Sequence, residues 1–421
     1  MAVNKAKGTY DVLPSESFKW QALEHKIREI TAQFNYLEIR TPIFEYSEVF
    51  HRQNELSDMV TKETYNFKDK GDRNLTLRPE GTAGVIRSFV ENKLYVNDPL
   101  SKMYYIGPNF RYERPQKGRF RQFVQFGVEA VGSNDPMLDA EVIELAYHFI
   151  QSLGLKGVSV RINTLGDQAS RKMFQDALKA HFEPVKHELC ADCQNRIDKN
   201  PLRILDCKVD HRHEKVVNAP TPVMYLTEAS KNYFDAVKRY LDQNDVKYVL
   251  ADRLVRGLDY YEHTVFEIEA EIEGFGAQNV LGGGGRYQNL VKELGGPDLP
   301  GIGFAFGMER LLDALTQENI VFYEEQRLDV FGIAIDETHR SYLSQTLSLL
   351  RKEGYRATMD FNGKNFKTQL KNGLKTNARY LIIIGEDEYA TNSVSLKDTT
   401  TQEQVKLSKD ELINYLKEMR R

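Results

Sequence analysis

One segment of this chain differs in pattern from the sequence on both of its sides, and it restricts the possible domain arrangements. Residues 167–245 are rich in Lys, His and Asp and are mostly helical in period. Strand patterns precede this segment and resume at Tyr248. The strands are joined by loops, with helices interspersed but no regular βαβ alternation, which favours an antiparallel sheet. We therefore expect an α+β domain over residues 1–325, interrupted by a mainly helical insertion at 167–245.

A second, more compact unit is expected at the C-terminal end. A linker is predicted near residues 323–327, and three strands alternating with two helices follow it, at 328–335, 337–352, 355–359, 365–375 and 380–384. Such alternation favours a mainly parallel sheet, so residues 327–421 are predicted to form an α/β domain. Ser408-Lys-Asp-Glu411 has the pattern of a capping box, which predicts the start of a last helix.

The composition excludes several classes of protein. The 421 residues exceed the roughly 250–300 residues that one core usually supports. A formal net charge of −4 excludes a generally basic nucleic-acid coat, so a nucleic-acid partner requires local basic patches. No apolar run reaches the ~18 residues that cross a bilayer, and the first residues lack the apolar centre of a signal peptide. Three cysteines make no disulfide framework. We expect a cytoplasmic protein with no membrane partner.

The densest group of reactive side chains lies at residues 110–123, which contain four arginines, one lysine and one glutamate. Gln125 and Glu129 follow on alternating strand positions, on the same face as Phe123. Polar side chains on one face of an otherwise apolar strand indicate the lining of a cavity. Arginines at this density suit a polyphosphate, because arginine binds phosphate oxygens bidentately and keeps its charge. The alternative interpretation is a solvated basic hairpin.

Three weaker patterns accompany this group. Residues 254–267 place Arg256 shortly before a pair of tyrosines, residues 282–285 are all glycine, and residues 301–310 run from a glycine-rich strand into a helix with Arg310. Glycines within a strand usually mark a close approach of backbone or ligand. A glycine run alone is weak evidence, and the P-loop pattern is missing. For residues 301–310 the alternative is tight packing beside an exposed charge.

Together and in this order, these patterns closely resemble the class II aminoacyl-tRNA synthetases. The segments that resemble motifs 2, 3 and 1 of that class are Phe110–Glu113, Gly303–Leu311 and the residues around Pro42, the last of which would lie at a dimer interface. Two blocks and the chain start are similar to the histidyl enzymes, at residues 254–267, 283–287 and 7–14. The resemblance covers the whole chain and implies a bacterial-type histidyl-tRNA synthetase, a homodimer whose catalytic domain is followed by an anticodon-binding domain at 327–421.

The resemblance also implies a two-step reaction and a set of ligands. ATP, with Mg²⁺, and L-histidine would form histidyl-adenylate and pyrophosphate, and the histidyl group would then pass to tRNA(His). Arg111 and Arg256 would be the catalytic cations. The implied ATP-binding residues are Arg111, Glu113, Arg119, Phe123 and Arg310. The implied histidine-binding residues are Glu80, Thr82, Gln125, Glu129, Arg256, Tyr260 and Tyr261. The implied tRNA-binding residues are Gln116, Lys117, Arg121, Lys367 and Lys371.

Two alternatives concern function and metal binding. A non-catalytic histidine-binding paralogue that regulates an ATP phosphoribosyltransferase would share the catalytic fold, but such paralogues typically lack the terminal domain and parts of the histidine signatures. Within the insertion, Cys190-Ala-Asp-Cys193, Cys207 and His211 have a spacing that suits zinc. The alternative is three reduced cysteines in a helical segment.

Overall fold

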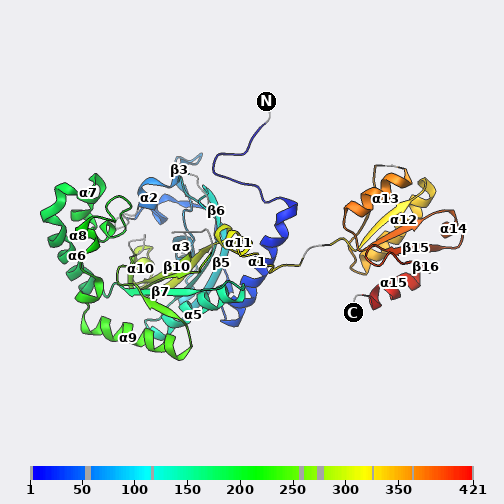
Figure 1. The fold of residues 1–421 in the computed structure, drawn as a ribbon. Coiled ribbons are helices and arrows are strands. Elements are labelled where there is room, and N and C mark those ends of the chain that lie inside the picture. The colour runs from blue at the N-terminus through cyan, green and yellow to red at the C-terminus, as the bar shows by residue number, and fades with distance from the viewer. Residues whose placement is uncertain are drawn as a thin grey trace. The chain divides into compact units, whose positions relative to one another are not determined.

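The computed structural model describes residues 3–52, 58–114, 118–255, 260–272, 279–324, 327–362 and 365–419. It divides into two compact units, Met1–Tyr323 and Glu324–Arg421, and each is described by itself (Figure 1). Among the helices that this description covers, none is both long enough and apolar enough to cross a membrane.

The larger unit is built on an eight-stranded sheet with the order β1-β5-β6-β11-β10-β9-β7-β8. In that order the strands span Leu37–Glu38, Ser101–Phe110, Gln122–Val131, Gly301–Gly307, Val280–Tyr287, Tyr261–Glu269, Ser159–Thr164 and Tyr248–Leu250. Neighbouring strands from β5 to β7 are antiparallel, and the edge pairs β1–β5 and β7–β8 are parallel. The predicted antiparallel sheet is confirmed, and it combines strands that precede the insertion with strands that follow it.

Alternation along β6 separates the core from the open face of this sheet. Phe126 and Val128 are buried in the main core, whereas Gln125 and Glu129 point to the opposite side and line a cavity. The main core is completed by four helices, namely α1 (Pro14–Gln33), α5 (Pro136–Ser152), α9 (Glu228–Gln243) and α11 (Met308–Gln317). The predicted face of β6 is therefore confirmed.

Smaller elements cover part of the other face. Helices α3 (Thr82–Glu91) and α10 (Leu290–Glu293) pack against Tyr105 and Tyr287 of the sheet. A three-stranded sheet with the order β2-β4-β3 comprises Phe44–Tyr46, Asn74–Leu77 and Tyr65–Lys68. The remaining short elements in this region are η1 (Ser47–Val49), α2 (Asp58–Lys62) and α4 (Leu94–Asn97).

The insertion consists mainly of short helices. They are α6 (Gln168–Phe182), η2 (Glu183–Glu188), α7 (Ala191–Lys199), η3 (Pro201–Ile204), α8 (Glu214–Val217) and η4 (Pro222–Tyr225). These segments share a small apolar cluster that includes Phe174, Cys193 and Ile204. Helix α9, which follows them, packs with Phe234 and Val237 in the main core instead. The last helix of the segment is thus part of the larger unit's own packing.

The smaller unit has a five-stranded sheet with the order β13-β12-β14-β15-β16. These strands span Ala357–Met359, Val330–Ala334, Tyr380–Ile384, Ser393–Asp398 and Gln404–Ser408. The first three are parallel and the last two are antiparallel additions. The helices are α12 (Glu337–Lys352), α13 (Phe366–Lys375), α14 (Glu386–Ala390) and α15 (Lys409–Glu418). The predicted capping box at Ser408 and Glu411 starts α15.

Candidate active site

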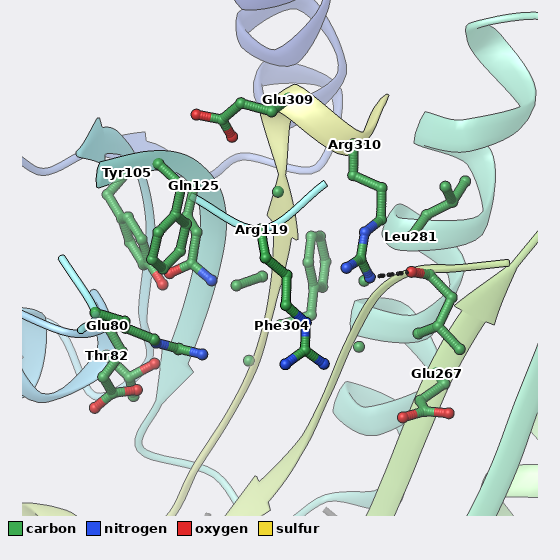
Figure 2. Close-up of a pocket in the computed structure, with 18 of the residues that line it drawn as sticks. Glu80, Thr82, Tyr105, Arg119, Gln125, Glu267, Leu281, Phe304, Glu309 and Arg310 are labelled. Atoms are coloured by element: carbon green, nitrogen blue, oxygen red, sulfur yellow. Dashed lines mark hydrogen bonds between the residues drawn. The ribbon is translucent and has the colours of Figure 1, made fainter. Parts of the chain in front are cut away.

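A cavity of about 400 Å³ lies on the open face of the larger sheet (Figure 2). Strands β6, β9, β10 and β11 form its floor, and residues that precede α3 and begin α11 contribute to its wall. The predicted ligand-binding residues that line it are Glu80, Thr82, Arg111, Glu113, Arg119, Phe123, Gln125, Glu129, Tyr260, Tyr261 and Arg310. Residues separated by most of the unit's length therefore meet in one cavity.

Glu129 is a buried carboxylate at one end of this cavity. Its two oxygens accept hydrogen bonds from the Thr82 hydroxyl at 2.6 Å and the Tyr287 hydroxyl at 2.8 Å. Burial raises the pKa of Glu129 to about 8, even though both hydroxyl donors favour the ionised form. At neutral pH this carboxyl therefore mostly holds a proton, which it can share with a basic group of a ligand.

Gly303 of β11 makes room for this carboxylate. A Cβ atom at position 303 would lie 2.3 Å from Glu129 Oε2 and 2.3 Å from the Val128 carbonyl oxygen. The glycine run on β10 is also explained by limited space. A Cβ at Gly284 would lie 1.9 Å from the Gly303 carbonyl oxygen. The close backbone approach expected from four consecutive glycines is confirmed there.

Glu80 is a second carboxylate at the same end, just before α3. It accepts hydrogen bonds from the Tyr260 hydroxyl at 2.9 Å and from the Ala83 backbone N–H at 3.1 Å. Burial raises the pKa of Tyr260, with the nearby Glu80 charge as the next cause, so this phenol stays a hydrogen-bond donor. This end of the cavity therefore concentrates carboxylates and hydroxyls.

Guanidinium groups gather at the other end. Arg310 donates to the Val280 carbonyl oxygen at 2.7 Å, and Figure 2 shows it beside Arg119. Burial and, next, the charge of Arg119 lower the pKa of Arg310. Arg119 pairs with Glu113 at 3.0 Å. Cations held together against their repulsion indicate a site for a polyanion.

Arg111 is a third arginine in the lining of the cavity. Its Nε donates to the Pro79 carbonyl oxygen at 2.9 Å, and its guanidinium carbon lies 5.2 Å from the centre of the Phe123 ring. The backbone contact fixes the guanidinium, while the Phe123 ring supplies a flat apolar surface next to it. The Phe123 ring is thus available for stacking by a planar base.

The remaining predicted residues lie elsewhere. Arg121 does not line the cavity, since its guanidinium carbon lies 4.0 Å from the Tyr112 ring centre and its Nε donates to the Glu113 carbonyl oxygen. Lys367 and Lys371 lie together on α13 of the smaller unit, along a shallow hollow. Arg256, Gln116 and Lys117 lie outside the described residues.

Sequence reasoning left two contributors without a role. Tyr287 belongs to the segment 283–287 that resembles the histidyl enzymes, but nothing in the sequence pattern indicated that its hydroxyl reaches Glu129. Glu309 is partly buried and accepts hydrogen bonds from the Val124 backbone N–H at 2.7 Å and from the Tyr10 hydroxyl. The sequence signal that could have indicated Glu309 was its position, as a charged residue at the junction of a glycine-rich strand and a helix.

The zinc prediction needs a correction in one residue. Cys190, Cys193 and Cys207 come together, but their fourth neighbour is Asp210. His211 instead places Nδ1 2.8 Å from the Lys208 carbonyl oxygen and is exposed. The turn after Cys207 directs the side chain of Asp210 toward the three cysteines. Sequence spacing alone could not show this.

Comparisons with known proteins agree with this geometry. The family model described as histidyl-tRNA synthetase matches residues 8–311, and the one described as anticodon binding domain matches residues 329–419. A histidine–tRNA ligase from Acholeplasma laidlawii is 59% identical over 99% of both chains, and one from Anoxybacillus flavithermus is 51% identical over 99% of both. The crystal structure of apo S. aureus histidyl-tRNA synthetase is 41% identical, with a TM-score of 0.85 over 98% of this chain and 99% of that one.

Proposed function

The chain belongs to the histidyl-tRNA synthetase family, and from this premise we propose that it ligates L-histidine to tRNA(His) with ATP, using the cavity described above. The regulatory paralogue is set aside, because full-length relatives at 51–59% identity are named histidine–tRNA ligases and the anticodon-binding model matches residues 329–419. The observation that carries the proposal is the polarity of the cavity (Figure 2), with the carboxylates of Glu80 and Glu129 at one end and the guanidinium groups of Arg119 and Arg310 at the other.

The carboxylate end suits histidine. An α-ammonium and an imidazole both carry protons that a carboxylate can accept as hydrogen bonds. We assign Glu80, Thr82 and Gln125 to the ammonium, and Glu129 with Tyr261 to the imidazole, with Tyr260 holding Glu80 in place. A pocket built from such polar partners rejects analogues that lack them by ~10⁴-fold or more.

The arginine end suits ATP. Arg111 would contact the α-phosphate, Arg119 and Arg310 the outer phosphates, and Phe123 would stack on the adenine while Glu113 reads its amino group. A histidine carboxylate oxygen attacks the α-phosphorus, the bond to the bridging oxygen breaks, and pyrophosphate leaves. Fixed cations then stabilise the charge that develops on the phosphoryl oxygens. Arg256 is proposed as the further cation at this step.

Transfer follows without a covalent enzyme intermediate. The terminal ribose hydroxyl of tRNA attacks the acyl carbon, its proton passes to a phosphate oxygen of the adenylate, and AMP departs with the electron pair of the broken acyl–phosphate bond. Positioning and electrostatics account for such catalysis. We assign Gln116, Lys117 and Arg121 to the acceptor end, and Lys367 and Lys371 to phosphates near the anticodon. A cytoplasmic homodimer with the segment around Pro42 at its interface is part of the proposal.

Mg²⁺ fits the cavity through its carboxylates. Glu267 and Glu113 line the wall, and Mg²⁺ usually takes one or two carboxylates together with substrate phosphates. Glu267 and Glu113 are therefore the residues proposed to hold the ion. When bound, the ion would neutralise phosphate charge.

The test is histidine-dependent exchange of pyrophosphate into ATP. The wild-type chain should exchange only with histidine present, and Arg256→Ala should lose most of the rate while keeping its fold by circular dichroism. Arg73→Ala is the matched arginine control, because Arg73 is exposed and pairs with Asp69 away from the cavity. No exchange in the wild type would overturn the proposal, and an unchanged rate in Arg256→Ala would remove that residue's role.

A further inference from the structure

A compact set of metal-ligand side chains lies in the insertion, apart from the cavity. It comprises Cys190, Cys193, Cys207 and Asp210, whose ligand atoms all lie within 4.8 Å of one another. None of the four lines the cavity. Within the part of the chain that the structure describes, this is the group in which three or more Cys, His, Asp or Glu side chains come close enough to share one metal ion. The active-site assignment leaves it unexplained.

Two short elements hold the four residues together. Cys190 is the N-cap of α7 and Cys193 lies in its first turn, so both sulfurs sit at the positive end of that helix. Cys207 and Asp210 follow η3 and return toward the same point. Cys193, Cys207 and Asp210 are buried, which removes them from competing water.

We propose that these four side chains bind one zinc ion as a structural site. The sulfurs of Cys190 and Cys207 lie 3.8 Å apart, and two sulfurs bound to one tetrahedral zinc at about 2.3 Å each are separated by about 3.8 Å. Cys207 Sγ lies 3.8 Å from Asp210 Oδ2, near the roughly 3.5 Å expected for a sulfur and an oxygen on the same ion. The cysteines are free thiols, and a disulfide needs a far shorter separation.

The surrounding hydrogen bonds orient the ligands. The Cys190 backbone N–H lies 3.0 Å from Asp210 Oδ2 and 3.3 Å from Oδ1, which fixes the carboxylate plane. The Asp210 backbone N–H donates to Cys207 Sγ at 3.4 Å. Such outer contacts hold ligands in place before the metal arrives and offset thiolate charge.

The donor set selects the metal and its role. Three sulfurs favour a soft or borderline ion such as zinc over Mg²⁺ or Ca²⁺, which prefer oxygen. Four protein ligands leave no open position for catalysis, as in structural sites. The segment around Cys190 and Asp210 consists of short helices, and short helices are marginal alone. A metal that joins its two ends would stabilise it as a cross-link does.

The experiment measures metal in the full chain, purified without chelators. Elemental analysis should find about one zinc ion per chain. After zinc is removed, Co²⁺ should give the intense sulfur-to-cobalt absorption in the near ultraviolet. Asp210→Asn should weaken zinc binding by at least about 100-fold, the upper end of what loss of an outer contact costs. Cys193→Ser should abolish it, and the adjacent His211→Ala is the matched control that keeps it.

Two results would overturn the proposal. One is a freshly purified chain that lacks zinc and, once stripped, takes up neither zinc nor Co²⁺. The other is His211→Ala losing metal as fully as Cys193→Ser, which would refute this ligand set. Because the cysteine change alters a buried side chain, Asp210→Asn decides the matter if Cys193→Ser fails to fold.

Discussion

Glu129→Gln is expected to impair the use of histidine and to spare the use of ATP. In the empty cavity Glu129 has a pKa of about 8, so at neutral pH its carboxyl holds a proton. A bound imidazole, with an ordinary pKa near 6.5, can take that proton and form an imidazolium–carboxylate pair. Glutamine has the same shape but no proton to give, so it offers a neutral hydrogen bond only.

The magnitude follows from this difference. A hydrogen bond to a charged group contributes about 1.5–3 kcal/mol, against about 0.5–1.5 kcal/mol for a neutral one. The loss of about 1–2 kcal/mol corresponds to a roughly 5- to 30-fold rise in the KM for histidine. The wild-type KM should also rise with pH above about 8, because an ionised Glu129 no longer brings the shared proton. The Glu129→Gln enzyme should lack that rise.

The assay is pyrophosphate exchange with histidine varied at saturating ATP, repeated across the pH range. Glu262→Gln is the matched control, because Glu262 is a buried glutamate of β9 that bonds Asn289 and does not line the cavity. A histidine KM within two-fold of wild type for Glu129→Gln, or the same alkaline rise in both enzymes, would refute this reasoning.

Three further changes have defined outcomes. Gly303→Ala should lower kcat/KM for histidine by more than about tenfold, because its Cβ would lie 2.3 Å from Glu129 Oε2; unchanged exchange kinetics would contradict this. Asp139→Ala should lower the free energy of unfolding by about 3–5 kcal/mol, since Arg286 and Asp139 are both fully buried, and urea denaturation measures it. Lys371→Ala should raise the KM for tRNA and flatten its dependence on salt, whereas an unaltered salt slope would argue against a phosphate contact.

Periodicity was sufficient where a local rule decides side-chain direction. The two-residue period of β6 correctly placed Gln125 and Glu129 on the cavity face, opposite Phe126. The capping box at Ser408 is likewise a local rule, and it starts α15 as expected. Such features depend on a few neighbouring residues, which the sequence contains in full.

Features that depend on distant segments could not be predicted in this way. Spacing suggested His211 as the fourth metal ligand, yet a turn places Asp210 there instead. The Tyr287 hydroxyl reaches Glu129 only because β10 and β6 flank β11 in the sheet. Helix α9 packs in the main core although it follows the insertion without a visible break. Each of these outcomes is set by tertiary packing rather than by local pattern.

The strand order of the large sheet has a consequence for synthesis of the chain. β6 forms a hairpin with β5 early, but its other neighbour, β11, is made only after the insertion and β8 to β10. During translation β6, which ends at Val131, therefore keeps an open hydrogen-bonding edge until β11 is made from Gly301 onward. The small apolar cluster of the insertion is also completed late, because it includes Tyr261 and Val265 of β9. The cavity floor closes last, when β11 enters between β6 and β10. A chain truncated before β11 should therefore expose an unpaired strand edge and aggregate, rather than fold into an enzyme of lower activity.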